Sequence, residues 1–140
     1  MSQIRIFAFL ICLFSSVLAV ATNFTCDVCG MTVPNRTEIV LKDPTPGAKA
    51  LHVCSLSCFR KARKLKEYFS ADVANFNHPD KLLPADNAYF LIKSEKIKPD
   101  LGELAMPPYF GAFATKKDAD AAQVRYGYGQ VVQGLNEAIK

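Results

Sequence analysis

The side chains with the greatest chemical potential in this sequence carry sulfur, and they gather in two short stretches. The first stretch reads CDVCGM, from Cys26 to Met31, and the second reads HVCSLSC, from His52 to Cys58. Four cysteines, a methionine and a histidine are therefore close in the sequence. Thiolate, thioether and imidazole are ligands for soft and borderline metal ions.

The spacing of the cysteines favours one shared site over two separate ones. Cys26-x2-Cys29 predicts a tight turn that ends at Gly30, and Cys54-x3-Cys58 is expected to straddle the start of a helix. A helix N-terminus favours a thiolate over a thiol because its backbone N–H groups point at the sulfur. Two such pairs with 24 residues between them predict a metal site built from four thiols.

The sequence leaves the identity of the metal open between zinc and copper. Four thiolates suit Zn(II), whereas Cu(I) also accepts a thioether. Met31 follows Cys29 by two residues and is a candidate ligand, although packing in the core is the alternative. His52 is a further candidate, although a histidine that is simply exposed, or hydrogen-bonded to other groups, is the alternative. Met106, just before two prolines, could approach from the second half of the chain.

The first 21 residues predict export. A short n-region with Arg5 precedes an apolar run, Ile6 to Val20, and Ala19-Val20-Ala21 is a cleavage signature. We expect a signal peptide over residues 1–21 and a single domain over 22–140, in the periplasm or secreted. An uncleaved membrane anchor is the alternative, but the run is short for one. Cys12 lies within the run, too early for lipidation.

Charge adds little about partners. The net charge is +4, and much of the excess lies in Arg60 to Lys66, which is either a docking patch for an acidic partner or one solvated helix face. No nucleic-acid-binding pattern is present, because aromatic residues do not alternate with the basic ones. An exported protein meets oxidising conditions, so the cysteines could also form structural disulfides. We expect oxidation of Cys26–Cys29 or Cys54–Cys58 to block metal uptake.

The half of the chain that bears the cysteines, residues 22–80, predicts two strands, a helix and a third strand. The strands are expected at 37–42, 49–53 and 73–76, with a turn at 43–47 between the first two. The helix should begin after Ser55 as its N-cap. Its predicted buried face consists of Cys58, Ala62, Leu65 and Phe69.

The second half, residues 85–140, repeats this order. Strands are expected at 88–93, 109–114 and 130–133, with a Pro- and Gly-bearing loop between the first two. The helix should be capped by Thr115, end at Gly127, and bury Ala119, Ala122 and Tyr126. A short helix could close the chain. The two helix starts are 60 residues apart, so we predict an α+β fold of two duplicated strand–strand–helix–strand modules with antiparallel sheet.

Two stretches resemble the NosL family of copper-binding accessory proteins for assembly of nitrous oxide reductase. They are CDVCGM and the later MPPYFGAFATKKDADAAQVRYGYGQVV. The resemblance implies a NosL-like fold, related to that of organomercurial lyase, and Cu(I) binding in the periplasm. It matches Met31, with Cys26 or Cys29, and Met106 to the family's soft ligands. The pair Cys54-x3-Cys58 is more similar to TRASH- and YHS-like metal-binding modules.

Together these observations predict an exported carrier of a soft metal, not an enzyme. Its cargo would be Cu(I), with Zn(II) as the alternative, and its partner an acceptor cuproenzyme, such as nitrous oxide reductase, or its maturation machinery. The competing hypotheses are a structural four-cysteine zinc module and a thiol-based enzyme, in which Asp27 is the only acid inside the motif. The candidate ligands are Cys26, Cys29, Met31, His52, Cys54, Cys58 and Met106.

Overall fold

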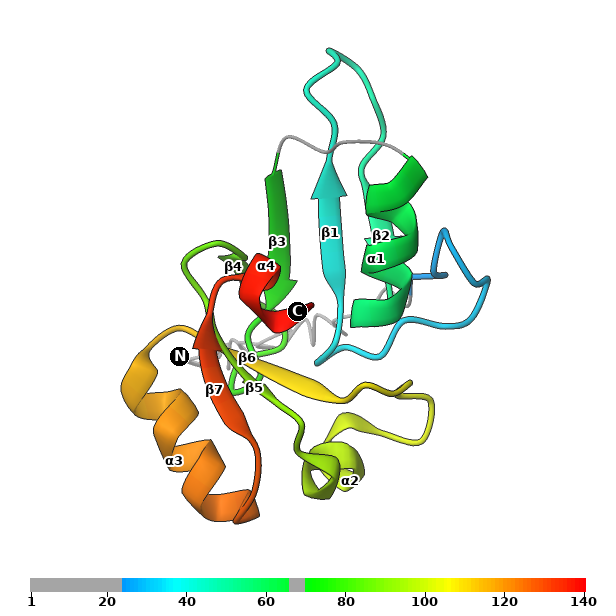
Figure 1. The fold of residues 1–140 in the computed structure, drawn as a ribbon. Coiled ribbons are helices and arrows are strands. Elements are labelled where there is room, and N and C mark those ends of the chain that lie inside the picture. The colour runs from blue at the N-terminus through cyan, green and yellow to red at the C-terminus, as the bar shows by residue number, and fades with distance from the viewer. Residues whose placement is uncertain (1–23, 66–69) are drawn as a thin grey trace, which may run out of the picture.

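The computed structural model describes residues 24–65 and 70–140 (Figure 1). The expected signal peptide, residues 1–21, and Phe69 of the expected helix face lie outside the described residues. Within the described part of the chain, no helix combines the length and the apolar character needed to cross a bilayer.

The first half forms a four-stranded antiparallel sheet with one helix beside it. Strands β1 (Ile39–Lys42) and β2 (Leu51–Val53) form a hairpin, helix α1 (Leu56–Leu65) follows, and β3 (Ser70–Ala74) returns beside β1. A short strand, β4 (Leu82–Pro84), extends the sheet, whose order is β2-β1-β3-β4. Strand β2 is therefore an edge strand, and in Figure 1 α1 is drawn in front of β2.

The second half forms a three-stranded antiparallel sheet. Strands β5 (Tyr89–Ile92) and β6 (Phe110–Phe113) pair, helix α3 (Lys116–Tyr126) follows, and β7 (Gln130–Gln133) pairs with the other edge of β5. Helix α4 (Leu135–Ala138) comes last and lies between the two sheets in Figure 1. The sheet order β6-β5-β7 is second, first, third, as it is for β2-β1-β3 in the first half.

The predicted α+β fold with duplicated modules is therefore confirmed at the level of topology. Both helices also begin in the same way, because each is capped by a hydroxyl. The Ser55 oxygen accepts a bond from the backbone N–H of Cys58 at 3.1 Å, and that of Thr115 accepts one from Asp118 at 3.1 Å. Such caps satisfy N–H groups that have no partner within the helix. The predicted buried face of α3 is also confirmed.

Four details differ from the sequence predictions. The third strand of the first half, expected at 73–76, begins earlier and spans Ser70–Ala74. The Pro- and Gly-bearing loop contains two helical turns, η1 (Glu95–Ile97) and α2 (Lys98–Leu101), because Pro99 fits the first turn of a helix. The expectation that Leu65 is buried is wrong, because α1 has reached the solvent there and Leu65 is 87% exposed. Strand β4 was not predicted, since a three-residue strand has too short a pattern to recognise.

The two halves share one apolar core. Ile39, Leu41 and Val53 from the first sheet belong to the same buried cluster as Phe90 and Phe110 from the second. Helix α4 adds two side chains to this cluster, Leu135 and Ala138. Three of the four cysteines, Cys26, Cys54 and Cys58, also belong to it. The thiols are therefore set against packed apolar side chains that belong to both modules.

Contacts with the end of the chain account for part of the basic run on α1. Arg60 donates to the backbone carbonyl of Ile139, and Arg63 donates to the side-chain oxygen of Asn136 at 2.6 Å. These two cations therefore hold the C-terminal segment against α1. Lys61 and Lys64 are exposed. Cations near the C-terminus of α1 are also favourable because of the helix dipole.

Candidate metal site

The first pair of cysteines lies in a tight knuckle. The backbone N–H of Cys26 donates to the carbonyl of Met31 at 2.7 Å, and Gly30 donates to the carbonyl of Cys26 at 2.9 Å. Thr25 and Thr32 form an isolated antiparallel bridge on either side. Gly30 has a φ of +75°, which an L side chain rarely adopts, so glycine is required for the chain to reverse here.

The second pair of cysteines lies where β2 meets α1. Cys54 directly follows the last residue of β2, and its carbonyl accepts a bond from the buried hydroxyl of Thr37 at 3.0 Å. Cys58 lies in the first turn of α1, where the Ser55 cap holds its N–H. The end of an edge strand and the first turn of a helix thus fix two thiols four residues apart.

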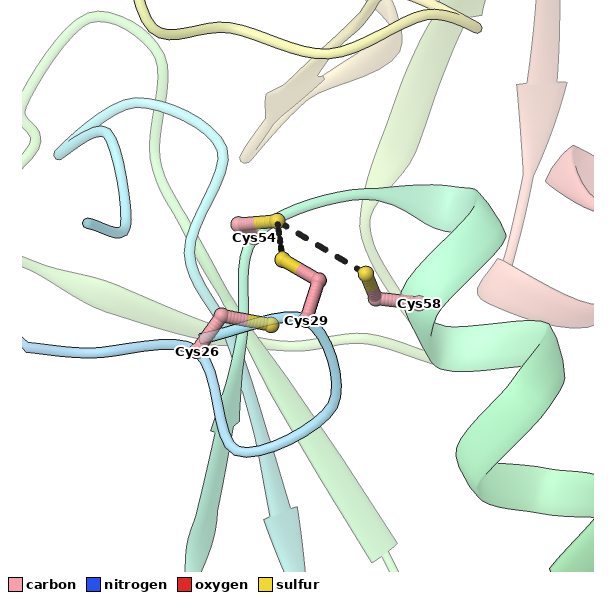
Figure 2. A group of neighbouring side chains, drawn as sticks. All are labelled: Cys26, Cys29, Cys54 and Cys58. Carbon is pink, nitrogen blue, oxygen red and sulfur yellow. Dashed lines mark hydrogen bonds between the residues drawn. The ribbon is translucent and has the colours of Figure 1, made fainter. Parts of the chain in front are cut away.

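The fold brings the four sulfur atoms together. All four lie within 4.8 Å of one another, and they point toward a common space from the knuckle, the end of β2 and the start of α1 (Figure 2). Sulfur atoms of Cys29 and Cys54 are 3.5 Å apart, and those of Cys54 and Cys58 are 3.7 Å apart. All four are free thiols, since a disulfide bond would need about 2.05 Å.

These separations suit a metal with sulfur ligands. A tetrahedral ion with metal–sulfur bonds of about 2.3 Å places its sulfurs roughly 3.8 Å apart. The Cys29–Cys54 and Cys54–Cys58 separations lie close to that spacing, and soft thiolates select Cu(I) or Zn(II) over harder ions. The donor set therefore fits either ion, and small movements of the side chains would complete the coordination.

Exposure distinguishes one cysteine from the other three. Cys26, Cys54 and Cys58 are buried, with exposed fractions of 1%, 1% and 6%, whereas Cys29 is exposed. Three thiols are therefore shielded by the apolar core, and one faces the solvent. A ligand from another molecule can reach the site on the side of Cys29.

The surroundings shift the pKa values of the three buried thiols in different directions. For Cys26, burial alone would raise the pKa, but backbone N–H groups of Cys29, Val28 and Cys54 outweigh it and lower the pKa to about 7. Burial raises the pKa of Cys54, and the neighbouring thiols add to that effect. Burial also raises the pKa of Cys58. Among these three buried thiols Cys26 is thus the one most ready to bind a cation, and the other two release protons when a metal enters.

Asp27, between the first two cysteines, fastens the knuckle to β2. Its N–H donates to the carbonyl of His52 at 2.9 Å, and its carboxylate oxygen Oδ2 accepts from the N–H of His52 at 2.8 Å. The imidazole of His52 is held in turn: Nδ1 lies 2.5 Å from the Glu38 carboxylate, and the ring stacks on Phe24 with centroids 3.8 Å apart. These contacts join the segment before the knuckle to the strand before Cys54.

The other three candidate ligands are His52, Met31 and Met106. His52 is not a member of that group, and its Nδ1 is engaged with Glu38. Met31 lies in the knuckle with 37% of its surface exposed. Met106 lies in the loop between α2 and β6 and is 41% exposed. Ligand roles for these three residues stay predictions.

Sequence reasoning did not identify the contacts that frame the site. Asp27 stood out only as the one acid inside the first motif, and its bonds to the backbone of His52 depend on the fold. Glu38 and Phe24 gave no signal, because the contact of Glu38 depends on the register of β1 and β2, and that of Phe24 depends on the knuckle lying beside β2. In that register Val40 lies opposite His52, which places Glu38 near the ring.

The fold and the thiol group define a class of small two-module α+β proteins whose first module carries a sulfur site. One solved protein of this fold is the copper chaperone NosL from Shewanella denitrificans, which is similar to this chain with a TM-score of 0.62 and 21% sequence identity. The match covers 79% of this chain and 86% of that one. The NosL-like fold expected from the sequence is thereby confirmed.

Comparison by sequence adds no further relative. No protein-family model matches the chain, and no curated protein is significantly similar to it in sequence. The function must therefore be argued from the geometry of the site.

Proposed function

We propose that this protein is an exported carrier of Cu(I), which it binds with Cys26, Cys29, Cys54 and Cys58 and passes to a copper-dependent enzyme or to the machinery that matures it. Nitrous oxide reductase is the acceptor that the resemblance to the NosL family suggests. The metal ion is the cargo of the protein, so the site must both hold it and release it.

The observation that carries this proposal is the uneven exposure of the four thiols. Three buried sulfurs can hold a soft ion away from water, while Cys29 remains accessible. Transfer between two proteins proceeds by ligand exchange, which requires that an incoming sulfur reach the metal before the last outgoing one leaves. A site with one accessible ligand permits that step, and a fully enclosed site does not.

Further support comes from the fold and from the chemistry of the residues. The similar solved structure is that of a copper chaperone. Met31 and Met106 are exposed thioethers, which could assist Cu(I) during entry or exit. Export rests on the expected signal peptide. A carrier needs no catalytic acid, and the carboxylate of Asp27 is already bound to the backbone of His52, so the main residue of the enzymatic hypothesis has a structural task.

A structural zinc site is the second candidate function. It is favoured by the spacing of 3.5 and 3.7 Å between sulfurs, which suits a tetrahedral ion. Structural zinc sites of this kind are closed and contribute directly to folding. The zinc hypothesis therefore predicts that the metal-free protein unfolds and that the exposed methionines have no effect on metal binding.

Competitive titration separates the two functions. The reduced protein would be titrated with Cu(I) and with Zn(II) against chelators of known affinity, with the Met31→Leu variant as a comparison. The carrier proposal expects one Cu(I) per chain, bound more tightly than Zn(II), and readily removed by a thiol-bearing acceptor. Tight Zn(II) binding that survives in the presence of excess Cu(I), and that Met31→Leu leaves unchanged, would contradict it.

A further inference from the structure

We infer that Asp27 is a specificity-determining residue that acts by positioning the thiols. By fastening the knuckle to β2, it holds both cysteine pairs at four-coordinate spacing and so sets how well the site accepts an ion that requires four ligands. This inference rests on the proposed function, because it concerns the selectivity of the same site.

The first step in the argument is the geometry of the attachment. Asp27 makes two hydrogen bonds to one residue, giving its N–H to the carbonyl of His52 and accepting the N–H of His52 at Oδ2. The carboxylate thus takes the place that a backbone carbonyl of a neighbouring strand would have. Because β2 is an edge strand, its outer N–H and C=O groups are available for this pairing.

The second step is that β2 is the common reference for both pairs. Cys54 lies two residues after His52 on the same strand end, and Cys58 is tied to that end through the cap at Ser55. Cys26 directly precedes Asp27, and Cys29 follows it by two residues. A displacement of Asp27 from His52 would therefore change the distance between the two pairs, while each pair kept its own spacing.

The third step is that the bonds within the knuckle do not tie it to β2, although the N–H of Cys54, just past β2, also interacts with the Cys26 sulfur. The bond from Cys26 to Met31, the bond from Gly30 to Cys26 and the Thr25–Thr32 bridge all join the knuckle to itself. They give the turn its shape. The stack of Phe24 on His52 helps to place the segment before the knuckle, and Asp27 makes the two hydrogen bonds that join the knuckle to β2 itself.

The consequence differs between metal ions because their coordination needs differ. Zn(II) in thiolate sites is almost always bound by four ligands. Cu(I) is held well by two or three thiolates, so it tolerates a change in the distance between the two cysteine pairs. Supporting residues around metal ligands are worth roughly 10- to 100-fold in affinity. Loss of the Asp27 attachment should therefore weaken Zn(II) binding much more than Cu(I) binding.

The test compares Asp27→Ala with Asp27→Asn in the reduced protein. Asparagine keeps an oxygen that can accept the N–H of His52, whereas alanine removes it, so the pair separates the hydrogen bond from the negative charge. Zn(II) and Cu(I) affinities would be measured against chelators. Hydrogen exchange at the His52 amide would be followed in the metal-free protein, as a readout that needs no metal.

The expected result has three parts. In Asp27→Ala the amide proton of His52 exchanges faster than in the original protein. This variant binds Zn(II) about tenfold more weakly, and its Cu(I) affinity stays within about threefold of the original. Asp27→Asn stays close to the original protein in all three. An equal loss for both metals in Asp27→Ala, or no loss for either, would overturn the inference and leave the carrier proposal standing. A loss in Asp27→Asn as large as in Asp27→Ala would also overturn it. An original protein that binds neither ion would end both proposals.

Discussion

The sulfur atoms of Cys29 and Cys54 lie 3.5 Å apart although 25 positions separate the two residues in the sequence. One belongs to the knuckle and the other to the end of β2. The contact between the two pairs is therefore shorter than that within the second pair, which measures 3.7 Å between Cys54 and Cys58. The site is a single group of thiols, and oxidation should act on it as one unit.

The first prediction concerns the disulfide that forms when the metal-free protein is oxidised. Because Cys29 is exposed and its sulfur lies 3.5 Å from that of Cys54, oxidised glutathione should produce a Cys29–Cys54 bond first. Cys29 attacks the reagent and releases one glutathione thiol, and Cys54 then displaces the second, so two electrons pass from the protein to the reagent. Digestion and mass spectrometry would identify the linked peptides.

The oxidised protein should no longer bind Cu(I) at this site, because two of its four sulfurs are used. As a control, Cys29→Ser should form Cys54–Cys58 instead. Formation of Cys26–Cys29 and Cys54–Cys58 alone would show that the sequence-based expectation about these pairs was the better one.

The second prediction concerns the reactivity of the thiols toward an alkylating reagent. In a Cys12→Ser background, the reduced metal-free protein should show one fast thiol, Cys29, and three slow ones, because access controls the rate for buried sulfurs. Bound Cu(I) should protect the fast thiol. Time-resolved mass spectrometry measures both effects. Cys29→Ser is the control and should lack the fast phase, whereas two or more fast thiols would contradict the burial seen here.

The third prediction uses the duplicated helix caps as a matched pair. Ser55→Ala and Thr115→Ala each remove one capping bond of 3.1 Å, so each should lower the free energy of unfolding by about 1 kcal/mol. Only Ser55→Ala should also weaken metal binding, because only the first cap orders a cysteine, Cys58. Urea denaturation and chelator competition measure the two quantities. Equal effects on metal affinity would mean that the cap does not position the thiol.

The fourth prediction concerns alkaline pH and lies away from the metal site. Burial raises the pKa of Tyr126 to about 12, and the hydrogen bond that its hydroxyl donates to Asp100 at 2.5 Å adds to the effect. The folded protein then keeps this proton between pH 10 and 12, where an unfolded tyrosine loses it. The stability from Tyr126 is therefore complete below pH 10 and is lost as the pH rises toward 12.

Between pH 9 and 11 this effect should cost about 1 kcal/mol of unfolding free energy. Tyr126→Phe should lose less over the same interval, because it has no phenol to ionise. Tyr128, which is 60% exposed, gives the control: Tyr128→Phe should follow the original protein. Denaturant titrations at the two pH values decide the matter, and identical pH slopes for the original protein and Tyr126→Phe would contradict the prediction.

The elements and the thiols could be predicted from the sequence because their signals are local. Ser55 and Thr115 are typical N-cap residues and indicate where helices begin, and Gly127 ends α3 in a left-handed conformation. The spacings within the two cysteine pairs are also short. The duplication followed from the 60-residue offset of the two caps. Local patterns of this kind need no knowledge of tertiary contacts.

The surroundings of the site could not be predicted because they depend on distant contacts. The stack of Phe24 on His52 and the bonds from Asp27 exist only once the knuckle lies beside the edge of β2. For the same reason the sequence could not show that the His52 ring stacks on Phe24 and that its Nδ1 contacts Glu38, while its role as a metal ligand stays a prediction. Leu65 fitted the helical period of the buried face, but that period does not show at which residue the helix stops being covered by the rest of the protein.

The repeated architecture has a consequence for how such a protein survives repeated use. In the 60-residue offset, Cys54 corresponds to Ala114 and Cys58 to Asp118, so the second module reaches the same topology without any thiol. Its core side chains continue into the cluster that holds the cysteines. A metal-free molecule should therefore keep its shape, escape proteolysis and be ready to bind again, as the proposed carrier function would require over many rounds.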